Sequence, residues 1–165
     1  MTAHEKLIAD LDKWFSIYIR LRDANEAGFI TCISCGRKVY WKDADAGHYI
    51  PRKHMATRFN EVNVNSQCID CNRYMRGNID AYREGIIALH GSEMYEKLEA
   101  MKFQTFKLSD AELKEMRTQV KEEIKRLKEE KKLNNIHTYY NPIYVPMPGY
   151  YGKAEIKEDE TNAIK

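Results

Sequence analysis

Apolar residues recur at intervals of three and four near the start of the chain, from Leu7 to Ile19. This spacing predicts a helix over residues 2 to 26 with one broad apolar face. Thr2 and Glu5 fit a capping box, in which each side chain bonds a backbone amide of the first turn. Aromatic residues on that face suggest two readings, a buried core or a surface that stacks on nucleotides. Helical spacing by itself favours the core.

A narrower apolar stripe recurs between residues 109 and 132, with charged residues on both sides of it. Ser109 and Glu112 form a second capping-box pattern, so a long helix is predicted to begin there. The stripe covers about three heptads. It can pack on its own domain or on a second copy of the chain, and the pattern favours neither, so a homodimer is a candidate assembly.

The middle of the chain has shorter patterns. Helices are predicted beyond Gly77 and Asn78 to residue 91, and over residues 92–102. A loop with one helical turn is predicted for residues 52–60. β-Branched and aromatic residues predict short strands at residues 29–31, 39–41 and 48–50. Pro51 ends the last of these strands.

The 165 residues are 43% hydrophobic and 32% charged, which is typical of one globular domain with helical appendages. No apolar run approaches the roughly 20 residues of a membrane span, and the first residues lack the organisation of a signal peptide. We therefore expect a cytoplasmic protein without a membrane partner. In that compartment thiols stay reduced, so paired cysteines are metal ligands before they are disulfides.

The four cysteines fall as two Cys-x-x-Cys pairs, and none is left over. Four thiolates satisfy a tetrahedral zinc ion completely, which predicts a structural zinc site. A redox dithiol is the alternative, but two motifs without thioredoxin-like patterning speak against it. Thirty-two residues separate the pairs, more than the roughly 15 to 20 of a simple zinc ribbon, so we expect a structured insertion between them. The predicted ligands are Cys32, Cys35, Cys68 and Cys71.

Basic residues gather around the cysteine pairs. Residues 31–76 contain eight basic and four acidic side chains, an excess of four positive charges in a chain whose net charge is +2. Such a zone suits a phosphate-rich partner, although scattered solvated side chains would give the same count. The candidates for phosphate contacts, which would position DNA without reading its sequence, are Arg52, Lys53, Arg58, Arg73 and Arg76.

The insertion carries residue patterns that resemble the HNH, or His-Me finger, endonucleases. They are Gly47-His48-Tyr49-Ile50-Pro51, then Glu61-Val62-Asn63-Val64, and Cys68-Ile69-Asp70-Cys71-Asn72. The resemblance implies a strand pair and a helix around one catalytic Mg²⁺ or Mn²⁺. It also implies that His48 activates water, that Asn63 holds the loop that orients the histidine, and that Asn72 binds the metal. A neutral imidazole and an amide oxygen suit these tasks.

One position departs from that family's pattern. A carboxylate or histidine usually precedes the catalytic histidine as a metal ligand, and here the residue is Gly47. Asp45 is the candidate substitute for the second ligand, and His54 is the alternative. A purely structural reading, in which His48 only packs beside the zinc, is also open.

A longer run, from Asp45 to Phe59 with Cys71-Asn72-Arg73-Tyr74, resembles the NinG (Rap) recombination proteins of lambdoid phages. That family implies a structure-specific endonuclease acting on branched double-stranded DNA such as Holliday junctions and D-loops, in the cytoplasm of the host cell. The competing hypothesis is a zinc module that binds DNA or a recombination partner without cutting. A transcription regulator has little support, because no helix carries a cluster of base-reading side chains.

The predicted fold class is α+β, with a small zinc-braced ββα unit of the His-Me finger type embedded among helices. Residues 1–28 are expected to form an N-terminal helix that packs on the core, and residues 29–91 the nuclease unit. Residues 92–133 are expected to form the C-terminal helices, and residues 134–165 an extended strap and flexible tail.

Overall fold

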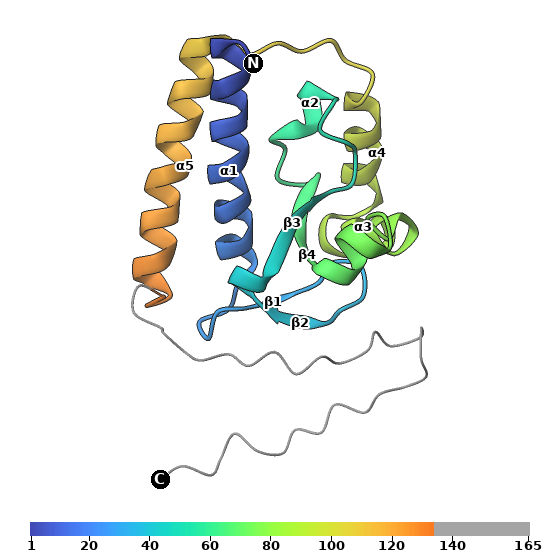
Figure 1. Cartoon of the computed structure of the whole chain (residues 1–165). Coiled ribbons are helices and arrows are strands. Elements are labelled where there is room, and N and C mark those ends of the chain that lie inside the picture. Colours follow the sequence, from blue (N-terminus) through green and yellow to red (C-terminus); the bar gives the residue numbers. More distant parts are fainter. Residues whose placement is uncertain (134–165) are drawn as a thin grey trace, which may run out of the picture.

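The computed structural model describes residues 1–133, so the strap and tail predicted for residues 134–165 lie outside the described residues. Two long helices, α1 (Ala3–Asp23) and α5 (Asp110–Glu130), lie side by side along one side of the molecule (Figure 1). Both begin at the predicted capping boxes. In α1 the Glu5 amide donates to Thr2 Oγ1 over 3.1 Å, while the Thr2 amide donates to Glu5 Oε2 over 2.6 Å.

The two long helices run in the same direction. His4 Nδ1 contacts Asp110 Oδ1 at 2.6 Å, and Arg117 Nη1 donates to Asp10 Oδ2 over 2.8 Å. At the other end the Lys131 ammonium group donates to three backbone carbonyls at the C-terminal end of α1, those of Leu21, Arg22 and Ala24. A cation there is favourable because those carbonyls lack helical partners.

The apolar stripe of α5 faces α1 within the same chain. Leu113, Ile124 and Leu127 are buried, and Ile124 and Leu127 join the core cluster that contains Leu21 of α1. Phe15 and Ile19 of α1 are buried as well. Of the two readings of the α5 stripe, packing within the chain is the one observed, and the aromatic face of α1 belongs to the core.

Two antiparallel strand pairs follow α1. The first joins β1 (Phe29–Thr31) to β2 (Lys38–Tyr40), and a helical turn at Trp41–Asp43 leads to the second. The second joins β3 (Ala44–His48) to β4 (Val64–Cys68), with Ala44 opposite Cys68 and His48 opposite Val64.

The remaining described helices complete the fold on the side away from α5. They are the short α2 (Met55–Arg58) between β3 and β4, a π-helical turn at Asp70–Tyr74, α3 (Ile79–His90) and α4 (Ser92–Met101). Figure 1 shows β3 and β4 between the α1–α5 pair and α3 with α4. None of the helices within residues 1–133 combines the length and apolar character needed to cross a membrane.

Side chains from both flanking layers hold β4. From α1, Arg22 Nη2 donates to the Val64 carbonyl over 3.2 Å, and Asp23 Oδ2 accepts from the Ser66 amide over 2.8 Å. From α3, the hydroxyl of the fully buried Tyr82 accepts from the Asn65 amide over 2.9 Å. These bonds satisfy backbone groups at the strand edge that would otherwise be unpaired.

The strand predicted at residues 48–50 lies earlier in the chain, since β3 begins at Ala44 and ends at His48. The strand β4 was not predicted. Its five residues are all buried and three are polar, so neither alternation nor an apolar run marks it. The architecture is a mixed fold of helices and two small sheets with a cysteine cluster.

Candidate active site and cysteine cluster

The four cysteines meet in one cluster, as their spacing predicts. Their Sγ atoms all lie within 4.8 Å of one another, and none forms a disulfide. Cys32 comes from the end of β1, Cys68 ends β4, and the other two lie on the turns that follow. All but Cys35 are buried. Four sulfurs at this separation can bind a metal ion such as zinc.

The local backbone turns each pair inward. After Cys32 the chain bends at Gly36, whose φ of +74° is readily adopted only by glycine and whose amide donates to the Cys32 carbonyl over 2.9 Å. In the second pair, the Cys71 amide donates to Cys68 Sγ over 3.5 Å, and Asn78 Nδ2 donates to Cys71 Sγ over 3.4 Å. Amide donors stabilise thiolates, so both turns suit a bound dication.

His48 lies at the end of β3, and its imidazole has a defined tautomer. Its Nε2 contacts the Arg58 carbonyl at 2.9 Å. A carbonyl only accepts, so Nε2 carries the proton and Nδ1 keeps its lone pair. No group within residues 1–133 bonds Nδ1. Burial lowers the pKa of His48 to about 4, although the Arg58 carbonyl favours the protonated form. The imidazole is therefore neutral near pH 7 and can accept a proton at Nδ1.

Asn63 holds the loop that follows His48. Its side chain is fully buried, and Oδ1 accepts from the Ile50 amide over 2.7 Å. Its Nδ2 donates to the carbonyls of Ile50 and Thr57 over 3.0 and 2.9 Å. These are the expected bonds to the loop backbone. They connect the residues just after His48 to α2, whose last residue supplies the carbonyl that His48 contacts.

Asn72 lies on the π-helical turn next to the cysteines, where its Nδ2 donates to Asp45 Oδ2 over 2.9 Å. The exposed Arg73 forms a two-pronged ion pair with the same carboxylate, through Nε to Oδ2 and Nη2 to Oδ1, both over 2.7 Å. Burial alone would raise the pKa of Asp45, but the bonds from Arg73 and Asn72 outweigh it and lower that pKa. Asp45 is therefore ionised at neutral pH.

The missing side chain at Gly47 has a steric explanation. A Cβ at Gly47 would lie 1.9 Å from Oε1 of Gln67, so the fully buried glutamine occupies the space that a side chain would need. Gln67 Nε2 donates to the Gly77 carbonyl over 2.8 Å and to Ser34 Oγ over 2.7 Å. Its Oε1 has no hydrogen-bond partner among the described residues.

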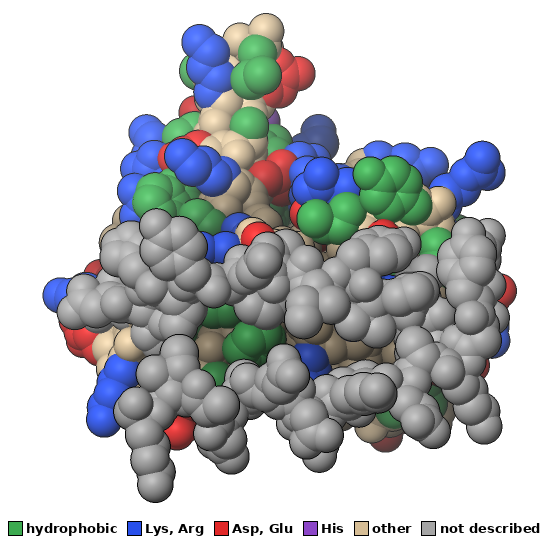
Figure 2. Space-filling model, turned by 60° about the horizontal axis from the view of Figure 1, so that its bottom comes forward, with side chains coloured by type: hydrophobic (Ala, Val, Ile, Leu, Met, Phe, Trp, Pro, Cys, Tyr) green, Lys and Arg blue, Asp and Glu red, His purple; other side chains and the backbone are tan. Residues whose placement is uncertain are grey.

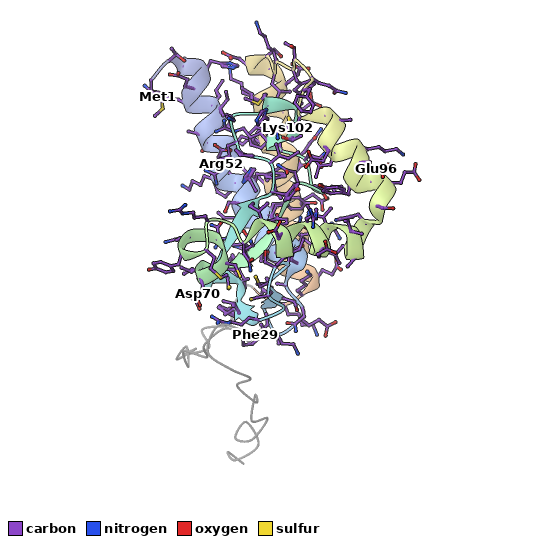
Figure 3. The ribbon with its side chains drawn as sticks, turned by 90° about the vertical axis from the view of Figure 1, so that its right-hand side faces the viewer. Met1, Phe29, Arg52, Asp70, Glu96 and Lys102 are labelled. Atoms are coloured by element: carbon purple, nitrogen blue, oxygen red, sulfur yellow. The ribbon has the colours of Figure 1, made fainter. Side chains whose placement is uncertain are left out.

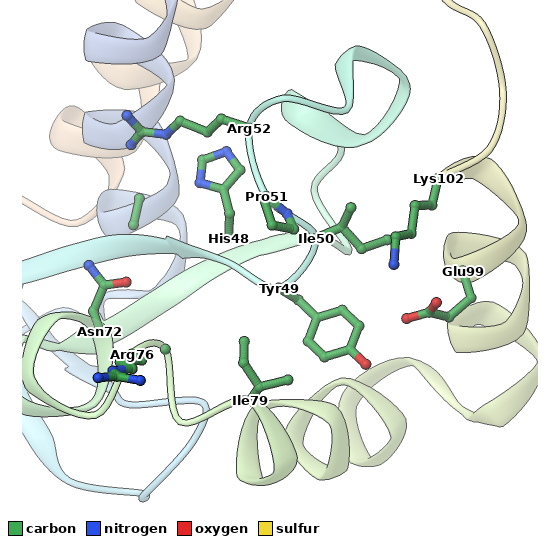
Figure 4. A pocket seen from close by; sticks show the side chains of 12 residues that line it. His48, Tyr49, Ile50, Pro51, Arg52, Asn72, Arg76, Ile79, Glu99 and Lys102 are labelled. Atoms are coloured by element: carbon green, nitrogen blue, oxygen red, sulfur yellow. The ribbon is translucent and has the colours of Figure 1, made fainter.

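His48 and Asn72 line the same open cleft, whose volume is about 630 Å³ (Figure 4). Three basic side chains also line it, and Glu99 is the acidic one. Arg52 and Lys102 come from the segments beside α2 and α4, and they project from the same face of the molecule (Figure 3). Arg76 follows the π-helical turn. A cleft with this lining can hold a phosphate next to the imidazole.

The other candidate residues lie apart from the cleft. The Arg58 guanidinium is held in the fold, because it forms an ion pair with Asp12 and donates to the Arg52 carbonyl over 3.2 Å. His54, the alternative metal ligand, contacts the Lys102 carbonyl through Nδ1 at 3.2 Å. Lys53 is exposed but is not part of the cleft.

Sequence reasoning did not identify Gln67, Tyr82, Glu99 or Lys102. The Tyr82 hydroxyl donates to the Gly47 carbonyl over 2.8 Å, a contact that its place in an apolar helical stripe does not indicate. Lys102 and Glu99 reach the cleft only through the docking of α4. Seen from the β1–β2 end, the visible Lys and Arg side chains are interspersed with acidic and apolar ones (Figure 2).

The chain is similar to proteins named "Protein ninG" from several phages. It is 39% identical to that of Escherichia phage lambda, 38% to that of Escherichia phage 933W and 36% to that of Salmonella phage P22, over 88 residues in each case. The matched stretch covers 50% of this chain and 39% of each relative, so the chain matches only about two fifths of these relatives' length. No solved structure shows a significant match.

The match to a family extends further than the match to these relatives. Residues 1–130 fit the family model described as "Bacteriophage Lambda NinG protein". This range includes both long helices, the cysteine cluster, and the cleft with His48 and Asn72. The chain therefore belongs to the bacteriophage lambda NinG protein family.

Proposed function

We propose that the chain is a metal-dependent endonuclease that hydrolyses phosphodiester bonds in branched DNA, including Holliday junctions and D-loops. The observation that carries this proposal is the state of His48, a neutral imidazole with Nε2–H donating to a carbonyl and Nδ1 left free. Its place in the cleft beside Asn72 and three basic side chains supplies the setting. The order of β3, β4 and the following helical turn resembles the ββα unit of HNH nucleases.

In this reaction His48 Nδ1 takes a proton from a water molecule as its oxygen attacks phosphorus. The bond from phosphorus to the leaving oxygen then breaks. Asn63 keeps the imidazole aligned, and Arg52, Arg76 and Lys102 hold the DNA backbone. A Mg²⁺ or Mn²⁺ bound by Asn72 Oδ1 would supply the positive charge that stabilises the leaving oxygen.

The same proposal assigns a structural zinc ion to the cysteine cluster. Four sulfurs leave no open position on a tetrahedral ion, so the zinc would take no part in hydrolysis. It would join the end of β1 to the end of β4. The π-helical turn that carries Asn72 follows directly, so the metal clip would fix the position of this turn relative to β3.

Cleavage of labelled DNA tests the proposal. Linear, forked and four-way substrates are incubated with and without Mg²⁺ or Mn²⁺, and the products are separated on denaturing gels. We expect metal-dependent nicking of the branched substrates, which His48→Ala abolishes without loss of junction binding or far-UV circular dichroism. His90→Ala is the matched control, since His90 is exposed at the end of α3, and it should cut normally.

One observation favours a second candidate, a DNA-binding module that does not cut. The position before His48 carries no ligand, and the candidate substitute, Asp45, is already paired with Arg73. Tight binding of a four-way junction without nicking in either metal would support this candidate. Full activity of His48→Ala would contradict the proposed mechanism itself.

A further inference from the structure

Both oxygens of Asp45 already accept hydrogen bonds. Oδ1 accepts from Arg73 Nη2, and Oδ2 accepts from both Arg73 Nε and Asn72 Nδ2. Asp45 is also absent from the residues that line the cleft, whereas Asn72 is among them. A cation bound through Asp45 would compete with the Arg73 guanidinium for these oxygens.

The contact between Asp45 and Asn72 sets the direction of the Asn72 amide. An ionised carboxylate can only accept, so the amide atom that faces it must be the nitrogen. The amide group is planar, and its oxygen points about 120° away from its nitrogen. Asn72 Oδ1 is therefore turned away from Asp45 and is left for a partner in the cleft that His48 also lines.

We infer that Asp45 is a positioning residue, which holds the Asn72 amide so that its oxygen serves as a protein ligand of the catalytic cation. Arg73 in turn holds Asp45 by the two-pronged pair. This inference rests on the proposed function. Mg²⁺ dehydrates reluctantly and keeps several waters, so water and phosphate oxygens of the DNA would complete its coordination. The glycine before His48 then needs no substitute.

The arrangement separates two roles that a carboxylate can have near a metal. A carboxylate ligand brings a negatively charged oxygen to the cation, and an asparagine in its place loses that charge. A positioning residue must only accept the Asn72 N–H, and an asparagine oxygen does this equally well. In Asp45→Asn, the amide oxygen of the asparagine can take the place of the aspartate Oδ2. It then still accepts two of the three bonds, those from Asn72 Nδ2 and Arg73 Nε.

Metal affinity measured without DNA distinguishes the two roles. The zinc-loaded full chain is titrated with Mn²⁺, and free Mn²⁺ is followed by electron paramagnetic resonance. We expect Asp45→Ala to weaken binding about 10- to 100-fold, as loss of an outer-shell partner does. Asp45→Asn should stay within about threefold of the wild type because it keeps the orienting bond. Asp43→Ala, an exposed neighbour on the same segment, is the matched control and should bind normally.

Two outcomes would overturn the inference. Equal weakening by Asp45→Asn and Asp45→Ala would make Asp45 a ligand, and normal binding by Asp45→Ala would give it no role. Asn72→Ala serves a different purpose, because it removes the ligand itself and should abolish Mn²⁺ binding. Unchanged Mn²⁺ binding by Asn72→Ala would reject the metal site of the proposed function, whichever way the Asp45 variants behave. Circular dichroism and zinc content confirm that each variant is folded.

Discussion

Replacing Asn63 by alanine tests how the loop after His48 is held. The side chain is fully buried and makes three hydrogen bonds, one accepted from the Ile50 amide and two donated to the carbonyls of Ile50 and Thr57. Alanine makes none of these bonds, and Ile50 is itself only 2% exposed. Three backbone groups lose their partners at once.

The expected magnitude follows from those bonds. A buried group left unpaired costs about 1 to 3 kcal/mol, and three groups at the lower end of that range lower the free energy of unfolding by about 3 to 4 kcal/mol. For a domain of this size that corresponds to a melting temperature lower by roughly 10 to 15 °C. Asn63→Asp should be no better, because it sets a negative charge against two carbonyls.

Urea unfolding in zinc-containing buffer, followed by tryptophan fluorescence, measures the loss. Asn72→Ala is the matched control, since it removes the same side chain from a half-buried position with one side-chain hydrogen bond, to Asp45, and should cost less than about 1 kcal/mol. A loss below about 1 kcal/mol in Asn63→Ala, or an equal loss in the control, would refute the assignment of Asn63 as the residue that fixes this loop.

Three further predictions concern the pH dependence of stability, the removal of zinc, and a side chain added at Gly47. Burial lowers the pKa of His48 from 6.5 to about 4, so its unfolded form binds more protons between these values, and the free energy of unfolding should fall as the pH drops from about 6.5 to about 4. His48→Gln should flatten this dependence by about 3 kcal/mol at most. Cys71→Ser or a strong chelator should remove zinc, which atomic absorption measures. The β3–β4 unit should then unfold, which circular dichroism detects. Gly47→Ala should destabilise the fold by about 1 to 3 kcal/mol through its clash with Gln67, and a double-mutant cycle with Gln67→Ala should show coupling between the two sites.

Each of these expectations has a clear counter-result. A pH dependence that is the same in His48→Gln would assign it to other groups. A chain that keeps its circular dichroism in the chelator would make the cysteine cluster dispensable for folding. Additive effects of Gly47→Ala and Gln67→Ala would mean that the glutamine does not limit the space at residue 47.

Local signals were sufficient to predict the helices. The boxes at Thr2 and Ser109 place the starts of α1 and α5 correctly, because capping depends on residues three apart in sequence. The cysteine cluster was predicted for a similar reason, since each pair forms its own turn. Membership of the NinG family, inferred from the residues around His48, is confirmed by the match over residues 1–130.

Long-range contacts account for what the sequence did not reveal. The strand β4 is specified by polar partners from α1 and α3 rather than by its own residues. Arg58 carries the positive charge expected of a phosphate contact, but its guanidinium donates to Asp12, which is 46 residues away in sequence. The pairing of Asp45 with Arg73 likewise depends on how the π-helical turn docks beside β3. No local pattern carries such information.

The parallel pairing of α1 and α5 has a consequence for the order of folding. Partners on these helices, such as Asp10 and Arg117, are 107 residues apart in sequence, whereas the cysteine cluster and the β3–β4 pair close loops of 40 residues or fewer. Distant contacts pay the larger loop-closure entropy before they are rewarded. The β3–β4 unit can therefore assemble around its metal while α1 still exposes its apolar face. Docking of α5 on that face would then be a late step, which buries the face and completes the core.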